Sequence, residues 1–173
     1  TDEDAALDAL TWYGDIDADG FGDLNVTTLA CYQPSGFVPD STDCDDTRDL
    51  TNPGAFEYCN AIDDNCDGTI DEDSAVDAPT WYFDEDLDGF GNTNISTVTC
   101  YQPSGYILDN TDCDDTRDLS NPDAEEYCNG YDDNCDGTID EETAIDSSTW
   151  YLDADGDGFG SGSLTQQSCT QPT

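Results

Sequence analysis

Hydrophobic residues are sparse along this chain and stand in short groups between long polar stretches. The groups at residues 11–13, 27–32 and 80–82 combine β-branched and aromatic side chains, which is typical of short strands. Residues 33–36, with the sequence Gln-Pro-Ser-Gly, predict a turn. We therefore expect short strands joined by turns, with most of the chain in loops.

Two positions predict short helices. Asn52-Pro53 and Asn121-Pro122 have the sequence of a helix N-cap followed by proline at the first helical position. Each would begin a helix of one to two turns that ends near Tyr58 or Tyr127.

The same pattern returns every 69 residues, so that Trp12 aligns with Trp81 and Trp150. We expect a first repeat at 1–69, a second at 70–138 and a partial third at 139–173. Repeats of this kind stack so that each contacts mainly its neighbours, which predicts an elongated array. Because the sequence begins and ends inside a repeat, we expect it to be part of a longer array.

The composition of the chain limits the kinds of partner that it can bind. The chain has 43 acidic residues, 2 basic residues and no histidine, for a net charge of −41. Such a chain repels itself and has the charge of a disordered protein. Its aromatic residues and cysteines recur at fixed spacings, however, so we expect bound cations to neutralise the carboxylates and complete a fold. Nucleic acids and anionic membranes need basic patches and are excluded as partners. No stretch is apolar enough for membrane insertion.

Nine cysteines at repeated spacings, without histidine, predict disulfides rather than zinc or iron–sulfur sites. A repeat of this size and composition cannot bury a large core, so it needs such cross-links. Disulfides indicate a secreted protein, either extracellular or at the cell surface. The cysteines expected to form them are Cys31, Cys44, Cys59, Cys66, Cys100, Cys113, Cys128 and Cys135.

The most informative motif, Asp-Xaa-Asp-Xaa-Asp-Gly-Phe-Gly, occurs three times. Carboxylates at positions 1, 3 and 5 with glycine at position 6 form the first half of an EF-hand-type calcium loop. The backbone carbonyl of position 7 and the side chain of position 9 then join the ion. We call this segment loop A (residues 15–23, 84–92 and 153–161). Its candidate ligands are Asp15, Asp17, Asp19, Phe21 and Asp23, then Asp84, Asp86, Asp88, Phe90 and Asn92, then Asp153, Asp155, Asp157 and Phe159.

Loop A cannot complete a calcium sphere alone, because position 12 is hydrophobic in every copy where an EF-hand has glutamate. The segments Asp-Cys-Asp-Asp at 43–46 and 112–115 are predicted to supply the missing oxygens. Bridges Cys31–Cys44 and Cys100–Cys113 would hold them there, although four cysteines per repeat allow three connectivities. The candidate donors are Asp43, Asp45, Asp46, Asp112, Asp114 and Asp115.

A second type of loop, loop B (residues 63–71 and 132–140), matches EF-hand positions 1, 3, 5, 6, 7, 8 and 9. Position 12 again lacks glutamate, so Glu57 and Glu126, with Asp49 and Asp118 as alternatives, are predicted to complete it. Bridges Cys59–Cys66 and Cys128–Cys135 would hold the short helix against the loop. Asp64 and Asp133, at position 2, are expected to face solvent. The candidate ligands are Asp63, Asn65, Asp67, Thr69 and Asp71, then Asp132, Asn134, Asp136, Thr138 and Asp140.

The sequence also predicts roles for residues outside the two loops. Trp12-Tyr13 is expected to pack beneath loop A rather than to form a carbohydrate platform. Arg48 and Arg117 are expected to pair with nearby carboxylates. Asn25 and Asn94 fit the N-glycosylation pattern. Histidine and lysine are absent, and no activated serine or phosphate-binding loop is recognisable, so we expect no enzyme activity.

The order of these motifs, from Trp-Tyr through loop A, Asp-Cys-Asp-Asp, Asn-Pro and Glu-Tyr-Cys-Asn to Asp-Asn-Cys-Asp-Gly-Xaa-Ile-Asp-Glu, resembles the bacterial MopE-type putative metal-binding repeat. That family is named after a methanotroph surface copper protein. The loops alone are similar to thrombospondin type 3, dockerin and EF-hand calcium loops. The resemblance implies a secreted or surface-attached protein with a metal-dependent fold. Copper prefers imidazole or thioether ligands, whereas these loops offer oxygen.

The predicted fold class is therefore small, irregular and mostly loop, with short β-strands and one- to two-turn helices in tandem repeats stapled by calcium and disulfides. We expect at least two Ca²⁺ ions per full repeat. The predicted function is structural: a surface stalk, or an extracellular filament assembled from copies of the chain. The alternatives are a copper- or other metal-scavenging surface protein, and an adhesion module that binds carbohydrate or a protein partner.

Overall fold

The computed structural model describes residues 8–172 and divides the chain into two compact units. The first comprises the chain up to Pro79 together with Val98–Tyr101, and the second comprises Thr80–Thr97 and the chain from Gln102 onward. Regular structure in the described residues consists of eight short strands without any helix. The predicted mostly-loop fold with short strands is confirmed, and its helices are not found.

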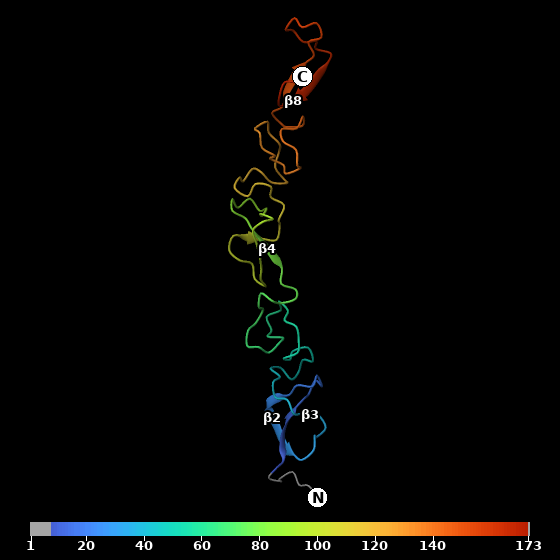
Figure 1. Cartoon of the computed structure of the whole chain (residues 1–173), viewed down its shortest axis with the longest axis vertical. Helices are drawn as coiled ribbons and strands as arrows, with labels where there is room; N and C mark the ends of the chain where they lie inside the picture. Colours follow the sequence, from blue (N-terminus) through green and yellow to red (C-terminus); the bar gives the residue numbers. More distant parts are fainter. Residues whose placement is uncertain (1–7, 173) are drawn as a thin grey trace. The chain divides into compact units, whose positions relative to one another are not determined.

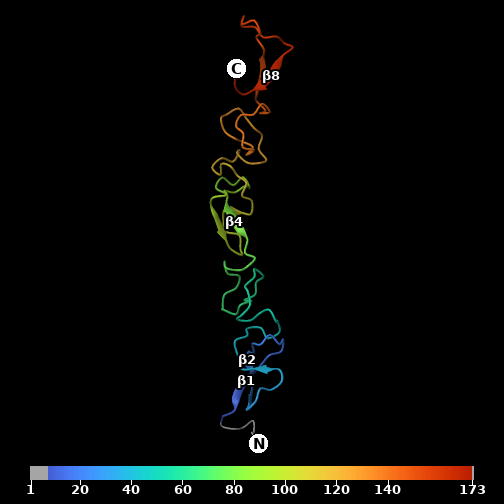
Figure 2. The same cartoon turned by 45° about the vertical axis from the view of Figure 1, so that its right-hand side comes forward.

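The first unit contains one three-stranded sheet, with strand order β2-β1-β3 (Figure 1). Strand β1 spans Leu10–Gly14, β2 spans Asp23–Ala30 and β3 spans Phe37–Val38. β1 and β2 are antiparallel neighbours and lie side by side in both views (Figure 2). The predicted strand at 11–13 lies within β1, and the one predicted at 27–32 begins earlier and ends earlier. The predicted turn is present, with the Phe37 amide donating to the Pro34 carbonyl at 3.3 Å.

The second unit repeats this sheet and adds a two-stranded one. Its first sheet has the order β5-β4-β6, from β4 (Thr80–Phe83), β5 (Ser96–Val98, of which Ser96 and Thr97 belong to this unit) and β6 (Tyr106–Ile107). β7 (Ser148–Tyr151) and β8 (Thr165–Ser168) form the antiparallel pair. Equivalent tryptophans close the β1–β2 and β7–β8 hairpins. The indole N–H of Trp12 donates to the Ala30 carbonyl, and that of Trp150 donates to the Ser168 carbonyl, each at 3.0 Å.

The helices predicted after Asn52-Pro53 and Asn121-Pro122 are single turns. The Ala55 amide donates to the Asn52 carbonyl at 2.9 Å, and the Asn52 side chain accepts from the Gly54 amide at 2.9 Å. No helix follows, because Glu57 turns back to bind the backbone of loop B, which fixes the chain in a non-helical path. The N-cap interaction was predicted correctly, whereas the prediction of a helix after it was wrong.

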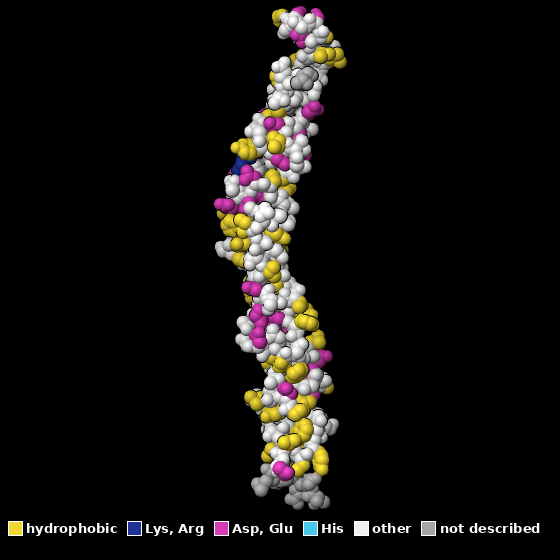
Figure 3. All heavy atoms as spheres, viewed as in Figure 1, with side chains coloured by type: hydrophobic (Ala, Val, Ile, Leu, Met, Phe, Trp, Pro, Cys, Tyr) yellow, Lys and Arg dark blue, Asp and Glu magenta, His cyan; other side chains and the backbone are white. Residues whose placement is uncertain are grey.

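The interior is polar. Among the described residues, the buried hydrophobic side chains are Ala30, Ala75 and Ala144, whereas many large hydrophobic residues, such as Leu50 at 76 %, are exposed (Figure 3). The hydrophobic effect, at roughly 25 cal/mol per Å² of buried apolar surface, therefore contributes little here. The buried polar residues are Asp46, Thr51, Asn52, Glu57, Asp64, Asp71, Asp84, Asp115, Ser120, Asn121, Glu126 and Asp133.

Four disulfides replace the missing core, and their pairing differs from the prediction. The bridges are Cys44–Cys66, Cys59–Cys100, Cys113–Cys135 and Cys128–Cys169. The predicted Cys31–Cys44, Cys59–Cys66, Cys100–Cys113 and Cys128–Cys135 bridges are wrong. Cys31, predicted to be bridged, lies outside these four, and Cys169 joins them.

The geometry of β2 explains the different pairing. Asp43 forms a parallel bridge with Asp23, at the start of β2, whereas Cys31 follows the other end of that strand. Eight strand residues span about 25 Å, so Cys44 is carried away from Cys31 and toward Cys66. Cys59, left without Cys66, joins Cys100, which comes from the next sequence repeat. This bridge, together with the Thr99 amide that donates to the Pro79 carbonyl at 3.3 Å, ties residues 98–101 to the first unit.

Tyr13 lies against the end of loop A and leaves no room for a side chain at Gly22. A Cβ atom at Gly22 would lie 2.9 Å from Tyr13 Cβ and 2.9 Å from the carbonyl oxygens of Gly14 and Asp40.

Gly22→Ala is therefore expected to destabilise the first unit by about 1–3 kcal/mol, because backbone must shift to relieve the contact. Thermal unfolding followed by circular dichroism should show a midpoint lowered by roughly 4–8 °C per kcal/mol. Gly162→Ala, where nothing lies within 4 Å of the added Cβ, is the control. Equal midpoints for the two variants would contradict this packing.

Candidate metal centres

Loops A and B share one backbone conformation. Position 4 is left-handed in both, with φ of 68° at Ala18 and 57° at Cys66. Position 6 is glycine with φ of 99° at Gly20 and 93° at Gly68, values that other residues rarely adopt. The two loops are therefore versions of one turn, as their sequences predict, and the second unit repeats both of them.

In the first unit, loop A gathers its three aspartates. Carboxylate oxygens of Asp15, Asp17 and Asp19 lie within 4.8 Å of one another. Hydrogen bonds inside the loop hold them: the Phe21 amide donates to Asp19 Oδ1 at 2.8 Å, and the Asp19 amide to Asp17 Oδ1 at 3.2 Å. Calcium takes oxygen ligands at 2.3–2.6 Å, so two ligands of one ion are at most about 5 Å apart. The spacing fits such an ion.

The predicted donor segment reaches loop A. Oxygens of Asp17, Asp43 and Asp46 also lie within 4.8 Å of one another. Two hydrogen bonds bring the segment and loop A together. The Asp43 amide donates to the Gly22 carbonyl at 3.2 Å, and the Ile16 amide donates to Asp46 Oδ1 at 2.7 Å. The segment was thus predicted correctly as a neighbour of loop A, although the disulfide expected to hold it there was not.

Four carboxylate oxygens in this cluster are buried without a hydrogen-bond partner: Asp15 Oδ1, Asp17 Oδ2, Asp43 Oδ2 and Asp46 Oδ2. Asp46 is only 7 % exposed, and its other oxygen is used by Ile16. Buried carboxylates without compensation are strongly unfavourable, and a bound cation is the usual compensation. The donors are all oxygens, which suits a hard cation. We call Asp15, Asp17, Asp43 and Asp46 centre A.

The second unit has the same arrangement. Oxygens of Asp84, Asp86 and Asp115 lie within 4.8 Å of one another, and the Glu85 amide donates to Asp115 Oδ1 at 2.9 Å. Asp112 is paired with Asn92 as Asp43 is with Asp23. The Oδ2 atoms of Asp86, Asp112 and Asp115 are buried without a partner. These four aspartates form the second centre A.

Burial and the charges of neighbouring carboxylates raise the pKa values of four aspartates in the two centres. Burial, followed by the charges of Asp88, Asp86 and Asp115, raises the pKa of Asp112 to about 6 from 3.8. The pKa of Asp17, Asp43 and Asp86 is raised for the same leading reason, their burial. A cation bound among these carboxylates would relieve the same repulsion.

Several predicted ligands lie elsewhere. Both oxygens of Asp45 have other partners, because one accepts from Thr47 at 2.6 Å and the other pairs with Arg48 at 3.3 Å; Asp114 likewise accepts from Thr116. Asp23 accepts from the Asn25 amide at 2.8 Å, and Asp49 is exposed. The predicted ion pair of Arg48 is confirmed. The roles of the Phe21 and Phe90 carbonyls stay predictions.

The third loop A closes on itself. Asp153 Oδ1 accepts from the amides of Gly156 and Asp157, and Oδ2 accepts from Gly158 at 2.9 Å. These backbone hydrogen bonds, led by that of Gly158, lower the pKa of Asp153. Asp155, Asp157 and the rest of the loop are exposed, in contrast to centre A.

Hydrogen bonds within loop B hold its first three candidate ligands in place. Asp63 accepts from the Asp67 amide at 3.1 Å and the Gly68 amide at 3.0 Å, and Asp67 accepts from the Thr69 amide at 2.9 Å. The second unit repeats these contacts at Asp132, Asn134, Asp136, Gly137 and Thr138.

Glu57 lies beside loop B, as predicted, in a supporting arrangement. It is 5 % exposed, and its carboxylate accepts from the amides of Asp64 and Asp71, each at 3.0 Å. Glu126 makes the same contacts with Asp133 and Asp140. These glutamates therefore hold the two ends of loop B together.

The carboxylate of Asp71, the predicted position 9 ligand, is bound by groups outside loop B. Its carboxylate accepts from the amides of Asn60 and Ala61, each at 2.8 Å, and from the Tyr101 hydroxyl. Asp140 makes the equivalent contacts with Asn129 and Gly130.

Glu72, one residue later, was missed by sequence reasoning. Its Oε1 accepts from Asn65 Nδ2 at 3.4 Å, and its Oε2 is buried without a partner. Both carboxylate oxygens of the equivalent Glu141 are buried without a partner. The EF-hand frame assigns no ligand to position 10, so only the repetition of Asp-Glu in both copies could have drawn attention to these residues.

Position 2 of loop B is buried, so the expectation that it faces solvent is wrong. Asp64 is 6 % exposed and accepts from Asn60 Nδ2 at 2.8 Å. Asp133 is 2 % exposed and pairs with Arg117 at 3.4 Å, while the Arg117 guanidinium stacks 3.6 Å from the Tyr131 ring. The predicted ion pair of Arg117 is thereby confirmed.

Two segments of the chain, residues 43–72 and 112–141, match the family model Cu-binding_MopE, which is described as "Putative metal-binding motif". The chain carries two MopE-type motifs. The predicted resemblance is therefore confirmed for these segments. Searches of curated proteins and of solved structures find no match.

Each MopE-type motif begins at the acidic segment of centre A and ends just after loop B. Asp43 and Asp46 thus belong to the motif, whereas Asp15 and Asp17 precede it. Centre A is assembled from both parts, so the motif alone contains only half of its carboxylates. In the part of the chain that the structure describes, no helix has the length and apolarity to span a membrane.

The raised pKa values predict that the stability of the metal-free protein falls as the pH rises. Asp112 has a folded-state pKa of about 6 against an ordinary 3.8, so the folded state binds more protons between these values. Its stabilising contribution is full below the lower value and is lost as the pH rises through the upper one. Saturating calcium replaces the protons and should reverse the trend.

Melting temperatures in EDTA are therefore expected to fall from about pH 4 to pH 7, and those in calcium to rise. Asp112→Asn should flatten the EDTA profile of the second unit. A metal-free protein that becomes more stable as the pH rises over this range would contradict the arrangement of centre A.

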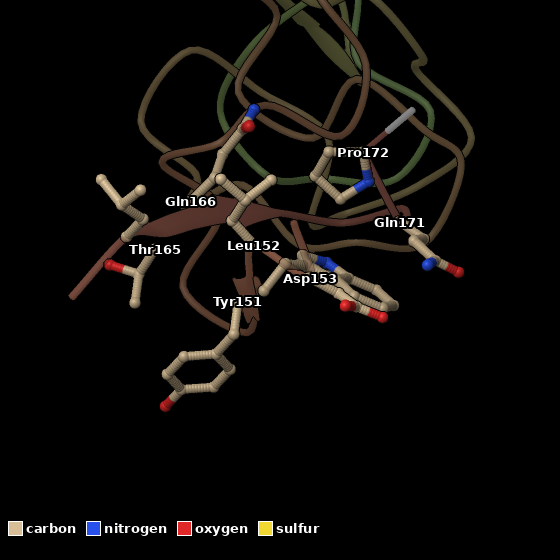
Figure 4. Close-up of a pocket in the computed structure, with 9 residues that line it drawn as sticks. Tyr151, Leu152, Asp153, Thr165, Gln166, Gln171 and Pro172 are labelled. Carbon is tan, nitrogen blue, oxygen red and sulfur yellow. The ribbon is translucent and has the colours of Figure 1, made fainter. Parts of the chain in front are cut away.

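A cavity of about 470 Å³ lies beside β7, lined by Trp150, Tyr151, Asp153, Gln166 and Gln171 among others (Figure 4). In the other two sheets, the equivalent strands β1 and β4 each have a further partner, β3 or β6, which β7 lacks among the described residues. The lining of the cavity includes residues of both β7 and β8, and the indole N–H of Trp150 donates to the Ser168 carbonyl at 3.0 Å.

Proposed function

We propose that this protein is a secreted, calcium-binding structural protein in which calcium holds acidic loops together within a tandem array. The observation that carries the proposal is the set of buried carboxylate oxygens without partners in centre A, repeated in both units. Loop B supplies a second centre per repeat, giving at least two Ca²⁺ ions in each. The array would serve as a surface stalk, or as an extracellular filament in which copies of the chain are the partners.

The chemistry of the donors favours calcium over copper. The chain has no histidine or methionine, and eight of its nine cysteines are in disulfides. Copper prefers imidazole and sulfur ligands, whereas carboxylate and carbonyl oxygens suit calcium. The disulfides support an oxidising, extracellular location.

Competition calorimetry distinguishes the two metals. We expect calcium to bind at two or more sites per repeat with a Kd on the order of 10⁻⁴ M, typical of extracellular modules. Copper added to the calcium-saturated protein should release little calcium. Stoichiometric displacement of calcium by copper would instead support metal scavenging.

A further inference from the structure

One buried side chain connects loop A, which supplies half of the carboxylates of centre A, to loop B. Asn52 is 9 % exposed, and its Nδ2 donates to Asp19 Oδ2 at 2.8 Å. Asp19 is position 5 of loop A and belongs to the same carboxylate group as Asp15 and Asp17. The position of Asn52 therefore depends directly on how loop A is ordered.

The backbone of the same residue contacts loop B. The Asn52 amide donates to the Asp64 carbonyl at 2.9 Å, and the Asp64 amide is held by Glu57 at 3.0 Å. Asp64 stands between Asp63 and Asn65, which are positions 1 and 3 of loop B. A displacement of Asn52 therefore reaches two candidate ligands of loop B through one peptide unit.

Asn52 is also held rigidly between these contacts. Its Oδ1 accepts from the Gly54 amide at 2.9 Å, and its buried neighbour Thr51 is 3 % exposed. The second unit is the same: Asn121 donates to Asp88 Oδ2 at 2.8 Å, donates to the Asp133 carbonyl at 2.9 Å and accepts from the Asp123 amide at 3.0 Å.

We propose that Asn52 and Asn121 are positioning residues that couple the two metal centres of a unit, so that ion binding at centre A strengthens ion binding at loop B. The proposal rests on the proposed function. An ion at centre A fixes Asp19, which fixes Asn52, which in turn fixes the backbone of loop B. The ordering is then complete before the second ion binds. Such coupling is reciprocal, because it is a free energy shared by both sites.

The position 6 glycines give one amide reporter per site in NMR spectra of the full chain: Gly20 and Gly68 in the first unit, Gly89 and Gly137 in the second. We expect calcium to shift Gly20 and Gly68 over the same concentration range. In Asn52→Ala the Gly68 midpoint should move to higher calcium, by on the order of fivefold, the lower end of typical coupling. Gly89 and Gly137 in the same sample should not change, and neither should any midpoint in Leu50→Ala, a change at an exposed side chain.

A double-mutant comparison separates coupling from simple structural support. Asp17→Asn should weaken binding at Gly68 when Asn52 is present and leave it unchanged when residue 52 is alanine. Asn52→Ser is the second variant should Asn52→Ala unfold the unit, since its shorter side chain can accept from Gly54 but cannot reach Asp19.

An equal effect of Asp17→Asn on Gly68 in both backgrounds would overturn the coupling while leaving calcium binding intact. Glycine amides that do not respond to calcium at all would instead overturn the proposed function.

Discussion

Removing calcium with EDTA is expected to destabilise both units strongly, although the four disulfides remain closed. Sites with a Kd near 10⁻⁴ M, in about 10 mM calcium, each stabilise the folded state by about 2.7 kcal/mol. Two sites then contribute about 5 kcal/mol per unit, comparable to the whole stability of many small domains. The described residues bury almost no hydrophobic side chains that could compensate.

Near-ultraviolet circular dichroism of the tryptophans and tyrosines, with thermal melting, measures this loss. Calcium should restore the signal. Sodium at equal ionic strength should not, because the centres need a divalent ion rather than general screening. Identical melting curves in EDTA and in calcium would show that disulfides and hydrogen bonds alone hold the fold.

Asp46→Asn is expected to weaken calcium binding at centre A by at least about tenfold while making the metal-free protein more stable. Asparagine keeps the oxygen that accepts from Ile16 but removes the charge of a side chain that is 7 % exposed. In metal-free protein this relieves repulsion among buried carboxylates, which we expect to be worth about 1–2 kcal/mol. The two effects have opposite signs, which loss of general structure would not produce.

Asp45→Asn is the matched control, because it removes the same charge one residue away. Asp45 pairs with Arg48 outside centre A, and surface ion pairs contribute about 0–1 kcal/mol. Calorimetry should find its calcium affinity within about twofold of the unmodified protein. Equal losses of affinity in the two variants would mean that overall charge, rather than centre A, binds calcium.

Local features of the fold could be predicted from the sequence. Trp12-Tyr13 lies in a strand because bulky side chains favour it, and the glycines at position 6 of each loop adopt left-handed φ. The missing ligand at position 12 correctly directed attention to Asp43 and Asp46, since an incomplete oxygen sphere needs donors from elsewhere.

Features that depend on long-range pairing could not be predicted. Spacing favoured bridges between cysteines near in sequence, but the parallel contact of Asp43 with Asp23 moves Cys44 to the far end of β2 from Cys31. The helix after Asn52 is absent because a tertiary contact of Glu57 overrides local preference. Asp64 is buried for a similar reason, since Asn60 satisfies its carboxylate.

A crystal structure of the calcium-bound protein, with anomalous scattering to identify the ion, tests the central claim most directly. We predict an ion in each centre A, contacted by oxygens of Asp15, Asp17, Asp43 and Asp46 in the first unit at 2.3–2.6 Å. The same four carboxylates lying together without an ion at saturating calcium would contradict the account.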